Sequence, residues 1–189
     1  MNGSWGALLR SEWRKVLTTK MVWVLTIVAV VFTCFNVVTV ALVGSGTIAS
    51  GAGGGTPTNL LLDPDYITTL LALAGTASTF VLILGIIAMT GEYRHMTITS
   101  TFLATPRRGR VLVAKMGLYA FLGALIAIIT VAAVLVATLL VLPRFDHAPV
   151  AASTLVSVAL GAVIGCVLYA VLGVSLGALI KSQITAIIL

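Results

Sequence analysis

Residues 21–43 read MVWVLTIVAVVFTCFNVVTVALV, a run of 23 residues without one charged side chain. An α-helix of about 20 apolar residues crosses the roughly 30 Å hydrocarbon core of a bilayer, so this run predicts a transmembrane span. Similar runs occupy residues 67–90, 111–142 and 150–180, and residues 184–189 begin another. The sequence therefore predicts an all-α fold, a polytopic transmembrane helical bundle in one domain, with four complete spans and the start of a fifth.

The composition excludes a water-soluble domain. Hydrophobic residues make up 60% of the chain and charged residues 8%, whereas soluble domains carry about 45–50% apolar and about 25% charged residues. The formal net charge of +6 does not indicate nucleic-acid binding, because most basic residues flank the spans and no aromatic side chains interleave them in a patch. The lipid bilayer is therefore the expected partner of this surface, and no nucleic-acid partner is expected.

Basic residues are distributed unevenly over the predicted loops. Of the eleven Lys and Arg residues, only Arg144 falls in a loop on the other side from the remaining ten. By the positive-inside rule, those ten residues and the N-terminus face the cytosol, so we expect a multi-pass protein of the cytoplasmic (inner) membrane. Residues 44–66 then lie outside, and we expect the three leucines at 60–62 to turn back toward the membrane interface.

Residues 4–18 precede the first span, and their apolar side chains recur at helical spacing. This pattern predicts an amphipathic helix at the membrane interface. Its apolar side includes Trp5, Leu9 and Trp13, and Glu12 projects from the same side. The Glu12 carboxylate either snorkels to the surface or pairs there with an arginine, or it forms a structural pair with the cytosolic loop.

Four glycines in the fourth span lie four or eight residues apart: Gly161, Gly165, Gly173 and Gly177. Together with Tyr169 they form a nearly continuous stripe, which predicts a face for close helix packing, either within the chain or in a dimer. Composition alone is the alternative explanation, because small residues are common in membrane helices.

Polar side chains within the spans are few, and none of them is acidic. Ion-coupled carriers place an ionisable group near the membrane midplane, so this absence argues against that class of transporter. Five polar side chains fit either interhelical hydrogen bonds or the lining of a substrate path: Thr33, Asn36, Thr39, Thr76 and Ser78.

Enzyme motifs are either missing or out of context. The segment at 173–177 matches the G-x-S-x-G pattern, but hydrolases place that pattern between a strand and a helix, with a histidine and an acid within reach. His95 and His147 fall in loops on opposite sides of the predicted membrane, so they cannot share a metal ion. The chain also lacks a phosphate-binding G-x-x-x-x-G-K-[ST] loop. We therefore expect no enzyme activity, no metal and no cofactor in this chain.

The loop at residues 91–110, GEYRHMTITSTFLATPRRGR, is more patterned than a simple linker. Residues 97–104 predict two short helical turns that end before Pro106. Ile98, Phe102 and Leu103 form a small apolar group between flanking charges. Such a group suits a groove on a soluble partner.

At these residues the chain resembles the membrane subunits, or permeases, of bacterial ABC transporters of the second export type, especially actinobacterial drug or antibiotic exporters. The resemblance rests on SEWRK at 11–15, EYRH at 92–95, TIT at 97–99 and ATPRR at 104–108. Such permeases usually have six spans, a connecting helix before the first and a coupling helix between the second and third. The resemblance implies a connecting helix at 5–18, a coupling region at 92–105, and a span set larger than the one seen here.

The resemblance also implies partners. A separate ATP-binding-cassette ATPase would bind the coupling region and hold ATP and Mg²⁺, and a second permease copy, identical or related, would complete the substrate path. The residues implied to contact the ATPase are Glu92, Tyr93, Arg94, Ile98, Phe102, Leu103, Arg107 and Arg108. Those implied for the connecting helix are Trp5, Leu9, Glu12 and Trp13.

The hypothesis from sequence is therefore the permease subunit of an ATP-driven exporter. Its expected substrate is amphipathic or hydrophobic, such as a drug, an antibiotic, a peptide or a lipid, because the spans are rich in Leu, Val, Ala and Thr. The alternative is a non-transport membrane scaffold, for example an immunity or assembly factor, that has no ATPase partner.

Overall fold

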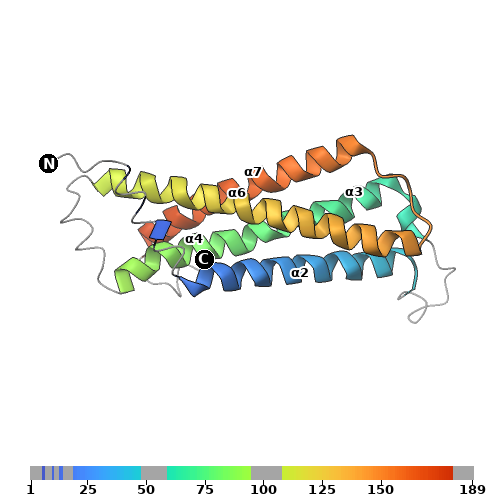
Figure 1. The fold of residues 1–189 in the computed structure, drawn as a ribbon, viewed down its shortest axis with the longest axis horizontal. Helices are drawn as coiled ribbons and strands as arrows, with labels where there is room; N and C mark the ends of the chain where they lie inside the picture. Colours follow the sequence, from blue (N-terminus) through green and yellow to red (C-terminus); the bar gives the residue numbers. More distant parts are fainter. Residues whose placement is uncertain are drawn as a thin grey trace.

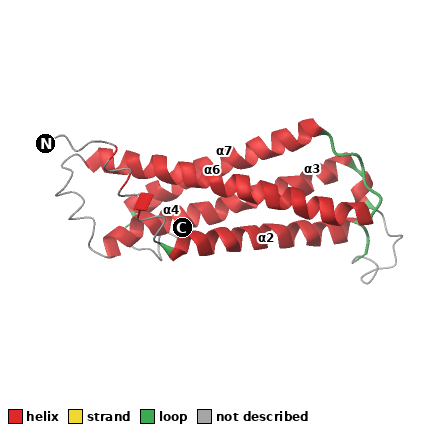
Figure 2. Ribbon diagram, viewed as in Figure 1, coloured by secondary structure: helices red, strands yellow, loops and turns green. Residues whose placement is uncertain are grey.

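The computed structural model describes residues 6, 10, 13, 14, 19–47, 59–94 and 108–180. The described α-helices are α2 (Lys20–Gly44), α3 (Pro64–Ala72), α4 (Ala77–Arg94), α6 (Arg108–Val141) and α7 (Ala152–Leu179). Three short 3₁₀ helices join or extend them: η2 (Leu60–Leu62), η3 (Leu73–Thr76) and η4 (Leu142–Arg144). No strand occurs in these described ranges (Figure 2), so the predicted all-α fold is confirmed.

Within the described ranges, four helical segments are long and apolar enough to cross a membrane: Lys20–Gly44, Pro64–Gly91, Leu112–Arg144 and Ala152–Leu179. They run along one another in an elongated bundle, and successive segments point in opposite directions (Figure 1). The polytopic helical bundle is thereby confirmed. The amphipathic helix expected at 4–18 is described only at residues 6, 10, 13 and 14, and the fifth span expected from residue 184 lies outside the described residues.

The outer surface of the bundle is covered by large apolar side chains. Phe35 is 67% exposed and Leu139 is 72% exposed, and both belong to helices whose buried faces are also apolar. A helix that is hydrophobic all round fits surroundings of lipid, where exposed apolar area carries no penalty. The bundle therefore has to be held together by close packing rather than by withdrawal of apolar groups from water.

Glycines bring α4 and α7 into backbone contact. A Cβ atom at Gly85 of α4 would lie 2.9 Å from the carbonyl oxygen of Ala170 and 2.9 Å from the amide nitrogen of Val174. A Cβ at Gly173 would collide with the carbonyl of Leu82, and one at Gly177 would lie 2.9 Å from the Ile86 oxygen. These separations leave no room for a side chain, so the two backbones can approach this closely only because glycine has none.

A fourth glycine brings α6 to the same central helix. A Cβ at Gly123 would lie 2.9 Å from the carbonyl oxygen of Cys166, in α7, and 3.2 Å from the Ala170 side chain. Cys166 and Ala170 are buried in the core cluster that α4, α6 and α7 share. Helix α7 therefore packs through small residues on both α4 and α6.

The four glycines of α7 do not lie on one packing face. Gly173 and Gly177 meet α4, whereas a Cβ at Gly161 or Gly165 would have no atom within 4 Å, and these two glycines lie toward the surface of the bundle. A step of four residues advances a helix by 400°, so each step drifts about 40°, and Gly161 and Gly173 differ by about 120°. The predicted stripe therefore divides into an inward pair and an outward pair.

The connections at one end of the bundle are tied together by polar groups. Leu61 is fully buried, its carbonyl accepts a hydrogen bond from the Ala148 amide at 2.8 Å, and the Asn59 amide group donates to the Asp146 carbonyl at 2.8 Å. The Tyr66 hydroxyl donates to the Val40 carbonyl at 3.0 Å. We call this end, with Asp63, Asp65 and Asp146, the acidic end.

The divided stripe predicts opposite effects of one substitution at two glycines of α7. Gly173→Ala places a Cβ against the Leu82 carbonyl and should destabilise the bundle by about 1–3 kcal/mol, as overpacking does. Gly165→Ala enters open space and should leave the stability unchanged or raise it by up to about 1 kcal/mol. Thermal unfolding of the two purified variants in detergent measures the difference. Equal melting temperatures would contradict the assigned contact.

Candidate functional site

The end of the bundle opposite the acidic end holds the start of α2 at Lys20, the end of α4 at Arg94, the start of α6 at Arg108 and the end of α7 at Leu179. We call it the basic end (left in Figure 1). The loop that sequence analysis assigned to a soluble partner connects α4 to α6 here. The candidate site is therefore the basic end, and in particular the contacts that hold α4 and α6 where they adjoin that loop.

Trp13 packs on the bundle near the basic end. Its ring centroid lies 6.0 Å from that of Phe121 in α6, with the ring planes inclined by 53°. The half-buried indole also packs against the core cluster of α4, α6 and α7. The segment before the first span thus contacts α6 through an aromatic pair of the kind that adds about 0.5–1.5 kcal/mol beyond its buried area. Trp5, Leu9 and Glu12 lie outside the described residues.

Tyr93 joins the last turn of α4 to the last turn of α7. Its hydroxyl donates a hydrogen bond to the carbonyl oxygen of Ala178 at 3.3 Å. The last carbonyls of a helix have no partner within the helix, so the tyrosine satisfies a group that the end of α7 leaves open. This hydrogen bond therefore links the end of α4 directly to the end of α7.

Of the other residues predicted to contact a partner, the structure describes the backbone of some and not of others. Glu92 and Arg94 belong to the turn of α4 that carries Tyr93, and Arg108 is the first residue of α6. Outside the described residues lie Ile98, Phe102, Leu103 and Arg107. The sequence did not single out Phe121 or the burial of Lys115, which is 3% exposed in α6. Phe121 lies in a long apolar run, and Lys115 follows a group of basic residues, so neither position stands out in the sequence.

The five polar residues predicted to line a path or to bond between helices do not gather at one place, although two of them meet. Thr33 and Thr76 meet, with their hydroxyl oxygens 3.3 Å apart, and thereby connect α2 to η3. Asn36 and Thr39 instead donate to carbonyls of their own helix, at 2.8 Å and 2.9 Å. Ser78 is half-buried near the start of α4. Thus one pair of the five forms an interhelical contact.

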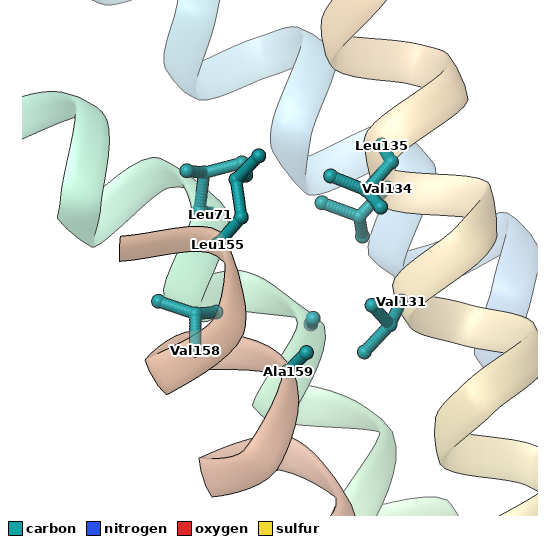
Figure 3. A pocket seen from close by; sticks show the side chains of 8 residues that line it. Leu71, Val131, Val134, Leu135, Leu155, Val158 and Ala159 are labelled. Carbon is teal, nitrogen blue, oxygen red and sulfur yellow. The ribbon is translucent and has the colours of Figure 1, made fainter. Parts of the chain in front are cut away.

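An apolar crevice lies between α3, α6 and α7 (Figure 3). Its free volume is about 10 Å³, roughly what one water molecule needs, so the crevice is narrow in this structure. Its walls are Leu71, Ala74, Val131, Val134, Leu135, Leu155, Val158 and Ala159. Because every wall residue is Leu, Val or Ala, the crevice offers contact only to hydrocarbon. Sequence analysis could not locate it, since those residue types also fill the rest of the spans.

Groups that bind metals are dispersed. Within the described ranges, no three His, Cys, Asp or Glu side chains gather at one place. Cys34 in α2 and Cys166 in α7 are free thiols. The chemistry of the described site is therefore that of helix contacts and an apolar crevice.

Comparison with known proteins identifies the family. A family model described as ABC-2 family transporter protein matches residues 8–189, which is nearly the whole chain. Neither a curated protein nor a solved structure matches the chain. The family and the four membrane-crossing helical segments agree with each other. The chain therefore belongs to the ABC-2 transporter family, as a multi-pass membrane permease subunit of an ABC transporter.

Proposed function

We propose that this permease subunit exports an amphipathic or hydrophobic molecule, driven by a separate ATP-binding-cassette ATPase that docks at the basic end. The observation that carries the proposal is the Tyr93 hydrogen bond, because it ties the helix that enters the coupling region to the end of α7. In this proposal ATP and Mg²⁺ are bound by the partner, and the present chain binds neither.

The distribution of charge supports an orientation with the basic end in the cytosol. Lys20 begins α2 at that end, whereas Asp63, Asp65 and Asp146 lie at the opposite end, together with Arg144. By the positive-inside rule, the N-terminus and the loop after α4 would then face the cytosolic side of the cytoplasmic membrane. A cytosolic ATPase would reach that loop directly.

Coupling would begin at the proposed docking region, residues 92–105, with Arg107 and Arg108 beside it. Closure of the ATPase pair on ATP would displace this region and with it the last turn of α4. Glu92 and Arg94 would orient the partner, and Ile98, Phe102 and Leu103 would fill its groove. Two kinds of contact would pass the displacement from α4 to α7: the glycine packing around Gly85 and Gly173, and the Tyr93 hydroxyl.

The proposed substrate class follows from the available surfaces. The crevice between α3, α6 and α7 has only apolar walls, and in a wider state it would suit the hydrocarbon part of a drug, an antibiotic, a peptide or a lipid. A second permease copy, identical or related, would complete a path between the two subunits. The outward glycines Gly161 and Gly165 leave room for a helix of that copy to approach.

Retention of an ATPase tests the proposal directly. The tagged full-length chain, extracted from its native membrane in mild detergent, should retain an ATPase of the ATP-binding-cassette class. Phe102→Ala/Leu103→Ala should lose it, because the apolar anchor is removed. A matched control is Leu60→Ala/Leu62→Ala, which removes two exposed leucines at the acidic end and should retain the ATPase.

Mass spectrometry of the retained proteins is the readout for all three chains. If the correctly inserted wild-type chain retains no ATPase, the scaffold alternative replaces the transport proposal. If both double variants lose the ATPase equally, docking at residues 92–105 is contradicted.

The Tyr93 hydrogen bond predicts a separation of binding from coupling. Tyr93→Phe keeps the ring but removes the donor to Ala178, so the ATPase should remain bound. A net hydrogen-bond contribution of about 0.5–1.5 kcal/mol corresponds to a roughly two- to tenfold change, and we expect ATP hydrolysis by the complex in lipid to fall by that factor. Tyr169→Phe, at an exposed tyrosine of α7, is the control and should hydrolyse ATP at the wild-type rate. Identical rates for all three complexes would exclude Tyr93 from coupling.

A further inference from the structure

The second span is not one continuous helix. Helix α3 ends at Ala72, α4 begins at Ala77, and the 3₁₀ helix η3 lies between them. The Thr76 hydroxyl donates to the Leu73 carbonyl at 2.7 Å within this turn. By contrast, α6 continues for 34 residues from Arg108 to Val141 without a break. A 3₁₀ turn inside a longer helix has poorer hydrogen-bond geometry and frequently marks a hinge.

The half of the span nearer the acidic end is anchored to α2. The Tyr66 hydroxyl, in the first turn of α3, donates to the Val40 carbonyl of α2 at 3.0 Å. The same ring packs against Gly44, where a Cβ would collide with it. Leu61, just before α3, is fully buried at the acidic end. These contacts fix α3 to the end of α2.

The half nearer the basic end is anchored to α7. Gly85 touches the α7 backbone, since a Cβ added there would lie 2.9 Å from the Ala170 oxygen, and Tyr93 bonds to Ala178 at 3.3 Å. The crevice lies on the other side of the break, where Leu71 of α3 and Leu155 of α7 lie side by side and Val131 and Val134 of α6 form the opposite wall (Figure 3). Glycine contacts therefore hold α4 against the α7 backbone, whereas α3 borders the crevice together with α6 and α7.

The break is packed on one side and open on the other. Ala74 and Ala77 are buried, whereas a Cβ placed on Gly75 would have no atom within 4 Å. One polar contact holds the turn to a neighbouring helix, through hydroxyl oxygens of Thr33 and Thr76 that lie 3.3 Å apart. The Thr76 hydroxyl has the Leu73 carbonyl as its shorter partner, so it loses little if Thr33 moves away.

We propose that η3 is a joint about which α4 and α7 move as one unit relative to α2 and α3, and that this motion opens and closes the crevice. The use of this motion in transport rests on the proposed function, but the joint itself is a property of the permease chain. Displacement of α4 at the basic end then changes the space available to an apolar molecule about 20 residues farther along the span, at Leu71 and Ala74.

A distance measurement across the joint tests this inference. Spin labels at Thr69 in α3 and Leu179 in α7 occupy exposed positions on the two proposed units. Gly173 of α7 faces Gly85 of α4, and the two helices run in the same direction, so Leu179 lies level with Gly91. From Gly91 back to Thr69 is 22 residues, which is about 33 Å along the bundle at 1.5 Å per residue. The pair Thr79 and Leu179 lies within one unit and is the reference. Cys34→Ala removes the half-buried native thiol, and Cys166 is buried from the label.

Both pairs are measured by pulsed electron resonance on the full chain in lipid nanodiscs. We expect two populations for Thr69 with Leu179 and a single narrow one for Thr79 with Leu179. Gly75→Ala, which enters open space and favours a continuous helix, should change the ratio of the two populations about fivefold, as expected from the helix propensities of alanine and glycine. Gly117→Ala, in open space on unbroken α6, should leave both populations unchanged.

Three outcomes would contradict the proposal that η3 is a joint. One is a distribution across η3 as narrow as the reference. Another is a broad distribution that Gly75→Ala leaves unchanged. The third is a reference pair as broad as the pair across η3. The reference distance also reports whether each variant has folded. No ATPase takes part in this experiment. Its result therefore tests the joint without testing the proposed ATPase coupling.

Discussion

The backbone contact between α4 and α7 is the constraint on which the rest of the structure depends. In lipid, apolar surface gains nothing by burial against another helix, so association has to come from close contact of atoms. Gly85, Gly173 and Gly177 provide that contact, and Gly123 extends it to α6. The Tyr93 hydroxyl adds a hydrogen bond between the ends of α4 and α7, and the proposed coupling would use this link to move both ends together.

The glycine contacts and the crevice lie in different parts of the bundle. Close contacts lie around Gly85 and Gly173 and at the basic end, while Leu71 and Ala74 face a crevice toward the acidic end. The second span changes from α-helix to 3₁₀ helix between these two regions. If η3 is the proposed joint, the glycine contacts would pass a displacement of α4 to α7 and so change the space in the crevice.

The sequence predicted the all-α bundle because uncharged runs of more than 20 residues admit one structure in a membrane. It could not predict the break at η3, since no proline marks it. The division of the α7 glycines follows from helix geometry, because the 12 residues from Gly161 to Gly173 leave a rotation of about 120°, but the spacing was interpreted as one stripe. Gly85 and Gly123 were missed for a related reason: an isolated glycine shows its role only when its neighbour across the interface is known. Thr33 and Thr76, 43 residues apart in the chain, meet through the fold alone.

The most direct measurement of the central account is photo-cross-linking in intact cells, with a photoreactive amino acid placed at Phe102 or, for comparison, at Leu62 of the acidic end. The account predicts that position 102 captures a protein of the ATP-binding-cassette class and that position 62 does not. Capture of that ATPase at position 62, or capture at position 102 of proteins without an ATP-binding cassette, would contradict the placement of the energy source at the basic end.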